Sequence, residues 1–195
     1  MWTDSRGVAL VDVLAAASLS VVMAVVAVPV VGGTLDREHV IVGAHYLAAQ
    51  VQRARLESLK RATAVAVRVE LLDGRAAVQL FADGNGNGVR QIDVARNVDR
   101  ALTSRQWLDE HARDVSLRVN QAIRDIGSGA ELAEGDDPLR IGNTPLVSFS
   151  PSGGSTSGTL YVAGLRGPQM AIRIYGATGR VRVLTFDARA RKWHR

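Results

Sequence analysis

Hydrophobic residues follow one another almost without interruption near the N-terminus. Residues 8–31 read VALVDVLAAASLSVVMAVVAVPVV, and Asp12 is the one charged side chain among them. At about 1.5 Å per residue, a helix of this length spans roughly 36 Å, which exceeds a membrane hydrocarbon core of about 30 Å. We therefore expect residues 8–31 to form a single transmembrane helix.

A second helical pattern follows this segment. Pro29 and the Gly32-Gly33 pair weaken a helix and favour a kink at the end of the apolar run. Beyond them, apolar residues return at helical spacing, which predicts an amphipathic helix over 32–62 that packs on a sheet. The expected buried stripe consists of Val40, Ala44, Leu47, Ala48, Val51, Ala54, Leu56 and Leu59.

From residue 63 the pattern changes to the alternation typical of strands. Residues 63–71 and 76–81 flank Asp73-Gly74, which predicts a two-residue hairpin turn. Further strands are expected over 115–119, 146–149, 159–165, 169–175 and 180–186, whereas 127–143 is turn-rich and is expected to be a surface excursion. The predicted fold class is α+β, with a long N-terminal helix packed on an antiparallel β-sheet head over 63–195.

Positive charge is concentrated at the C-terminal end. Residues 166–195 hold eight arginines and lysines against one aspartate, and this net charge of +7 exceeds the +5 of the whole chain. Such an asymmetry suggests an anionic partner for this end. The chain has no cysteine, which excludes disulfides and thiolate metal sites.

Asp12 has an unusual position within the apolar run. A carboxylate in a membrane segment costs about 2.5 to 3.5 kcal/mol on insertion scales, so it usually marks a function or a partner. Counted from Val8, which follows Arg6-Gly7, Asp12 is the fifth residue and Pro29 the twenty-second. This register resembles that of type IV prepilins, which usually have phenylalanine first and glutamate fifth.

The prepilin resemblance implies processing and assembly residues. It implies a leader peptide over 1–7, cleavage by a prepilin peptidase between Gly7 and Val8, and N-methylation of Val8. Asp12 and Pro29 are then assembly residues, and residues 8–31 pack against other pilins in a filament. An uncleaved membrane anchor is the alternative for this segment.

Four segments of the head are similar to the GspH/FimT group of minor pseudopilins: 81–88, 149–153, 157–162 and 176–182. The resemblance implies a pilin-like structural subunit, a minor pseudopilin or minor pilin, of a type II secretion pseudopilus or a type IV pilus. The expected location is the inner membrane, with one span and the C-terminal head in the periplasm. The sequence does not distinguish a subunit of the secretion pseudopilus from a subunit of the pilus. A membrane-tethered binding domain that is neither cleaved nor assembled is a further alternative.

Nothing in the sequence points to catalysis. The four histidines are scattered, and no metalloprotease, nucleophile-elbow, phosphate-loop or redox-cysteine motif is present. We expect no enzymatic activity and no cofactor.

The loop at 83–88 carries Asp83, Asn85, Asn87 and Gly88 at the spacing of a calcium-binding loop. The twelfth position, which supplies the bidentate ligand in such loops, is Val94. We therefore expect a turn without metal, in which glycine and asparagine adopt positive φ. Calcium is the alternative.

A basic hairpin is expected at the C-terminal end. A turn over 176–179 places Tyr175 opposite Arg180 and Arg173 opposite Arg182, so that like charges face each other and an anion between them is favourable. Trp193 is available to stack on a base. The alternative function is therefore a DNA-binding minor pilin, whose candidate residues are Arg173, Arg180, Arg182, Arg189, Arg191, Lys192, Trp193 and Arg195. A solvated face, an anionic membrane surface or an acidic neighbouring subunit accounts for the same charges.

Overall fold

The computed structural model describes residues 5–165 and 168–194, and for residues 5–9 and 24–34 it describes the backbone alone. The chain divides into two units, Met1–Leu35 and Asp36–Arg195. The first is part of a helix, and the second holds the rest of that helix together with all of the strands.

Helix α1 extends over Ser5–Arg61. In the first unit, the side chains from Leu10 to Met23 are exposed. Within the described residues, the structure contains no helix that is long and apolar enough to cross a membrane. The predicted leader and the predicted assembly residue Pro29 lie outside the residues whose side chains are described.

The part of α1 in the second unit packs on the head through most of the predicted stripe. Six of its eight residues are buried: Val40, Ala44, Leu47, Ala48, Val51 and Ala54. The prediction is wrong for Leu56 and Leu59, which are 59% and 50% exposed. Ser58 is buried instead, because it lies one helical turn beyond Ala54 on the same side of the helix.

The first sheet contains β1 (Val65–Leu72), β2 (Arg75–Ala82), β3 (Arg100–Ala101), β4 (Gln106–Trp107) and β9 (Leu146–Phe149). Its order is β3-β2-β1-β9, and β4 also pairs with β2. Leu72 pairs with Arg75 across Asp73 and Gly74, both of which have positive φ, so the predicted hairpin turn is confirmed.

The second sheet contains β5 (Ser116–Leu117), β8 (Leu139–Arg140), β10 (Gly158–Ala163), β11 (Met170–Tyr175), β12 (Arg180–Asp187) and β13 (Lys192–His194). Its order is β13-β12-β11-β10, and both β5 and β8 pair with β10. A separate pair joins β6 (Ile123–Arg124) to β7 (Glu131–Leu132). Short helical turns are present at α2 (Gln91–Ala95) and η1 (Leu108–Glu110).

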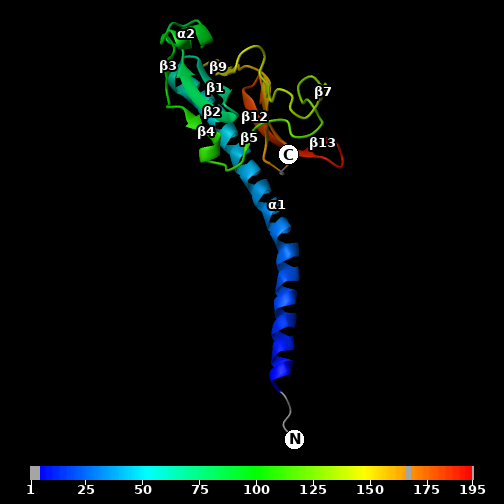
Figure 1. The fold of residues 1–195 in the computed structure, drawn as a ribbon. Coiled ribbons are helices and arrows are strands. Elements are labelled where there is room, and N and C mark those ends of the chain that lie inside the picture. The colour runs from blue at the N-terminus through cyan, green and yellow to red at the C-terminus, as the bar shows by residue number, and fades with distance from the viewer. Residues whose placement is uncertain (1–4, 166–167, 195) are drawn as a thin grey trace. The chain divides into compact units, whose positions relative to one another are not determined.

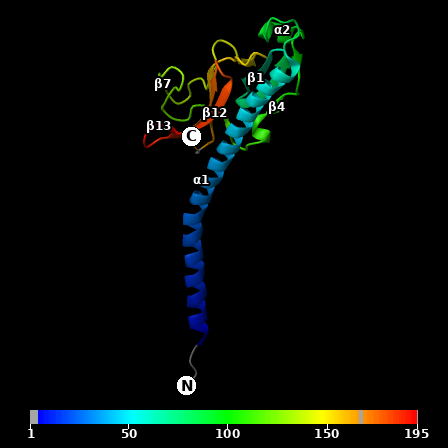
Figure 2. The same cartoon turned by 180° about the vertical axis from the view of Figure 1, so that it is seen from behind.

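All pairings are antiparallel, so the α+β class is confirmed. In both ribbon views, α2 lies at one side of the second unit, and β7 and β13 lie at the opposite side (Figures 1 and 2). The excursion predicted over 127–143 contains β7 and β8. The strand β13 was not predicted from the sequence.

The second sheet buries apolar side chains on both of its faces. One face joins α1 and the first sheet in the main core through Leu160, Ile172 and Ile174. The other face forms a smaller core, which contains Val119, Ile123, Leu132, Tyr161, Ala171 and Phe186. The face of the C-terminal hairpin that carries Arg173 and Arg182 is therefore partly covered by the β6–β7 pair.

Candidate functional site

Three arginines and a threonine lie in line across four neighbouring strands of the second sheet. Arg140 on β8 is opposite Thr159 on β10. Thr159 is opposite Arg173 on β11, which is opposite Arg182 on β12. Directly opposed residues of an antiparallel sheet project from the same face, with Cβ atoms about 5 Å apart. These four residues are called the arginine row below.

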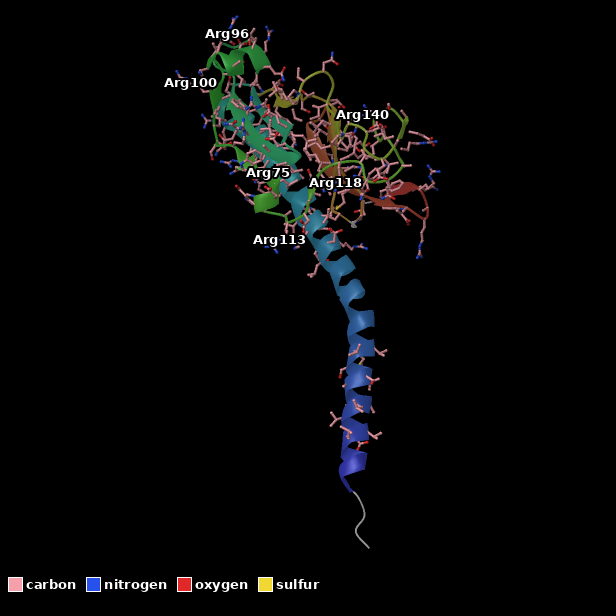
Figure 3. The ribbon with its side chains drawn as sticks, in the orientation of Figure 1. Arg75, Arg96, Arg100, Arg113, Arg118 and Arg140 are labelled. Carbon is pink, nitrogen blue, oxygen red and sulfur yellow. The ribbon has the colours of Figure 1, made fainter. Side chains whose placement is uncertain are left out.

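The sequence predicted half of this row. The predicted pairing of Arg173 with Arg182, and that of Tyr175 with Arg180, are both confirmed. Arg140 was not anticipated, because it belongs to a turn-rich stretch whose strand β8 is two residues long and pairs with a strand nearly twenty residues away. Figure 3 labels Arg140, and it also labels Arg96 and Arg100, which lie beside α2 and away from the row.

Arg173 is held in place by neutral oxygens. Its Nη1 donates to Oγ1 of Thr159 at 2.9 Å, and its Nη2 donates to Oγ of Ser157 at 3.5 Å. The hydroxyls hold the guanidinium in position but do not neutralise its charge, since neither carries a charge of its own.

The ring of Tyr175 lies close to both of the opposed arginines. The Cζ atoms of Arg173 and Arg182 lie 5.7 Å and 5.5 Å from the ring centroid, which is within the range of cation–π attraction. Nε of Arg182 is buried and has no hydrogen-bond partner within the described residues. The ring therefore offsets part of the repulsion that the sequence analysis attributed to these opposed charges.

The row is not neutralised by acids at close range. Among the described residues, none of the carboxylates lies within ion-pair distance of Arg140, Arg173, Arg180 or Arg182. One carboxylate, that of Asp125, lies near Arg173 without forming an ion pair with it. A Cβ atom placed on Gly127 would lie 2.9 Å from Nη1 of Arg173 and 3.3 Å from Oδ2 of Asp125, so the two side chains converge there.

Asp125 is a buried carboxylate with three donors. Tyr161 donates to its Oδ1 at 2.7 Å, and Ser128 donates to its Oδ2 from both the hydroxyl and the backbone nitrogen. Burial raises the pKa of Asp125, but these hydrogen bonds outweigh burial and the net pKa is lowered. Burial and the hydrogen bond to Asp125 raise the pKa of Tyr161. At neutral pH the pair is therefore a carboxylate and a protonated phenol.

The remaining basic candidates do not all share the face of the arginine row. In the β12–β13 pairing, Lys192 lies opposite Asp187 and Trp193 lies opposite Phe186. Because side chains alternate along a strand, Trp193 projects from the face of Arg182 and Lys192 projects from the other face. Arg191 lies 3.9 Å from Glu131, and Arg189 is exposed. Arg195 lies outside the described residues.

Trp193 is partly buried and packs against the smaller core. Its ring lies 5.1 Å from that of Phe186 and 5.7 Å from that of Tyr161, and its Nε1 donates to the carbonyl oxygen of Arg124 at 2.9 Å. The ring is partly buried, because β13 folds back onto β12 and places it against this core, and its stacking on a base stays a prediction.

The loop at 83–88 is organised by a carboxylate. Oδ1 of Asp83 accepts from the backbone nitrogens of Asn85 and Gly86, and Oδ2 accepts from that of Gly88. Burial raises the pKa of Asp83, but these backbone donors outweigh burial and lower it overall. Oδ1 of Asn85 accepts from the backbone nitrogen of Asn87. The loop is a hydrogen-bonded turn in which the carboxylate of Asp83 and the amide oxygen of Asn85 accept from backbone nitrogens.

A second carboxylate closes this loop, and the sequence analysis missed it. Asp99 is buried and accepts from the backbone nitrogens of Gly84 and Arg90. Within the described part of the chain, no three histidines or acids gather as a metal site requires.

The predicted assembly residue Asp12 lies in α1, and its side chain is exposed. Gly7 and Val8, which flank the predicted cleavage point, lie where the backbone alone is described.

Comparisons of the chain with protein-family models, with curated proteins and with solved structures found no match in any of the three.

Proposed function

We propose that this chain is a minor pseudopilin or minor pilin, a pilin-like structural subunit of a type II secretion pseudopilus or a type IV pilus. It is held in the inner membrane by residues 8–31, with its head in the periplasm. A prepilin peptidase cuts after Gly7 and methylates Val8. The observation that carries the proposal is the register of Gly7, Asp12 and Pro29 within one apolar run.

Elementary electrostatics supports a role for Asp12 in this proposal. After cleavage, the new amine at Val8 and the carboxylate of Asp12 lie one helical turn apart, and the positive end of the helix dipole favours a negative charge there. Asp12 is exposed on α1, so the carboxylate is available to the amine of a neighbouring subunit. Such pairing offsets the cost of placing the charge in an apolar filament core.

The packing of the second unit suits a subunit that bears load. Residues of α1 from Val40 to Ala54 are buried in the same core as the strands of both sheets. A force along this part of the helix is therefore transmitted to the whole core and not to a flexible linker.

Mass spectrometry of the protein recovered from membranes tests the proposal. We expect an N-methylated terminus at Val8. We expect Gly7→Val to retain the leader, because the peptidase must accept the residue before the cut, and Ser5→Ala to be processed normally. An unprocessed terminus in the unaltered protein contradicts the proposal and favours the membrane-anchor alternatives.

The arginine row favours a second candidate function, that of a minor pilin that binds DNA. Arg140, Arg173 and Arg182 share one face and form no ion pair with an acid among the described residues, and Arg180 is exposed beside them. Binding through these residues involves mainly phosphates, so it weakens steeply with salt and depends little on sequence.

Binding of duplex DNA to the full chain in detergent micelles, at two salt concentrations, tests this second candidate. The variant Arg180→Glu with Arg182→Glu is expected to lose most of the binding and to flatten its salt dependence. The matched control is Arg96→Glu with Arg100→Glu, which makes the same change of charge beside α2 (Figure 3). Equal loss in both variants contradicts a site at the row.

A further inference from the structure

One edge of the second sheet is open along half of a strand. The strand β13 pairs with β12 only from Thr185 to Asp187. Within the described residues, no strand pairs with the outer side of β12 from Arg180 to Leu184. An unpaired strand edge of this kind is a template for another strand.

The pairing with β11 determines which backbone groups face the open side. The backbone nitrogen of Phe186 donates to the carbonyl oxygen of Gln169 at 2.9 Å. Since every second residue of an antiparallel strand bonds to the same neighbour, Arg182 and Leu184 also bond toward β11. Val181 and Val183 then turn their N–H and C=O groups to the open side.

The side chains along this edge differ between its two faces. Val181 and Val183 are half-buried and pack against the main core. Arg180 and Arg182 project from the opposite face, where no described acid pairs with them. An incoming strand therefore meets apolar side chains and positive charges in alternation.

We propose that this edge binds an extended segment of a partner protein by β-strand addition, and that acidic and apolar residues alternate in that segment. The apolar residues of the segment cover Val181 and Val183, and its carboxylates pair with Arg180 and Arg182. Its backbone bonds to the N–H and C=O groups of the two valines. The proposal does not depend on filament assembly, since any chain with such a segment fits.

A protein strand fits this edge better than a nucleic acid does. A nucleic acid engages the arginines but offers no peptide groups to the edge and no aliphatic side chains to the half-buried valines. The ring of Tyr175 is already in contact with Arg173 and Arg182, and that of Trp193 is packed in the smaller core.

Synthetic peptides titrated into the full chain in detergent micelles test the proposal. The probe is a fluorescent hexapeptide in which valine alternates with glutamate. The matched control is the same peptide with N-methyl groups on the alternate residues that donate to the edge, which keeps every charge. We expect the control to bind at least about tenfold more weakly, which corresponds to about 1.4 kcal/mol.

Variants of the protein give an independent readout. Val183→Pro removes an outward N–H and leaves the bonds to β11 intact, because that N–H faces away from β11. We expect Val183→Pro to bind the valine–glutamate peptide about tenfold more weakly than the unaltered chain does, whereas Val183→Ile retains the affinity. A peptide with lysine in place of glutamate is expected to bind only after Arg180→Glu with Arg182→Glu.

Equal affinity for the parent and N-methylated peptides overturns the proposal, because binding then rests on charge alone. The proposal is also overturned if duplex DNA displaces the peptide and Val183→Pro alters the affinity for neither the DNA nor the peptide. The peptide comparison needs no variant, so it decides the question even if Val183→Pro fails to fold.

Discussion

Tyr161 donates a hydrogen bond of 2.7 Å to the carboxylate of Asp125, and both residues are buried. The same phenol oxygen accepts from the backbone nitrogen of Ile126 at 2.9 Å. These contacts attach the segment between β6 and β7 to β10, and this segment lies beside Arg173. The pair therefore supports one side of the arginine row.

Tyr161→Phe is expected to lower the free energy of unfolding by about 1 to 3 kcal/mol, because it removes one donor from a buried carboxylate. Urea denaturation of the full chain in detergent, followed by circular dichroism, measures the change. Tyr175→Phe is the control, since its ring contacts remain and no hydrogen bond of its hydroxyl is present within the described residues. An equal effect of the two substitutions contradicts the role assigned to the Tyr161–Asp125 contact.

Acid is expected to destabilise the head. The pKa values of Asp83 and Asp125 are lowered in the folded state, so below about pH 4, the ordinary range of aspartate, the unfolded chain binds more protons than the folded chain. The stability that these two carboxylates contribute is complete above this range and is lost as the pH falls through their pKa values in the folded state. Unfolding curves between pH 7 and pH 3 measure it.

The pH slope has its own control. Asp83→Asn keeps one acceptor oxygen and cannot titrate, so it is expected to be less stable at pH 7 and to lose less stability on acidification than the unaltered chain. Asp73→Asn makes the same substitution at the exposed turn between β1 and β2 and is the matched control. If the stability of Asp83→Asn falls more steeply with acid than that of the unaltered chain, Asp83 is not a source of the acid sensitivity.

Gly158→Ala is expected to be destabilising by about 1 to 3 kcal/mol, the usual cost of overpacking. A Cβ atom on Gly158 would lie 2.8 Å from the carbonyl oxygen of Arg140 and 2.9 Å from Cα of Ile141, and backbone atoms cannot move aside as a flexible side chain can. Gly154→Ala, whose Cβ would meet only Oγ of Ser150 at 3.4 Å, is the matched control. Thermal unfolding compares the two, and equal melting temperatures contradict the close packing of β8 on β10.

Substitutions along α1 test which side of the helix is buried. Leu47→Ala is expected to cost about 2 to 5 kcal/mol, because Leu47 is buried in the main core. Leu56→Ala is expected to change stability by less than about 0.5 kcal/mol, because Leu56 is exposed. Urea denaturation of both variants measures the difference. A comparable loss in the two variants places Leu56 in a buried contact and contradicts the structure.

Local patterns were sufficient for the elements that are made within a short stretch of chain. The β1–β2 hairpin follows from alternation around Asp73-Gly74, and the register of Arg173 with Arg182 follows from alternation around a four-residue turn. In both cases the turn and the period of two leave one pairing that keeps the apolar residues on one face. The register of Gly7, Asp12 and Pro29, on which the proposed function rests, is also a property of the sequence alone.

Contacts between distant segments were decided by the tertiary structure. Arg140 joins the arginine row by pairing with Thr159, and Trp193 contacts Arg124 and Tyr161, across stretches of chain that no local period spans. Leu56 and Leu59 fit the helical stripe by spacing, but the buried side of α1 continues through Ser58. The sequence determined which residues are apolar and where the chain turns. Which of those residues are covered depended on the arrangement of the two sheets, because burial requires a partner surface from elsewhere in the chain.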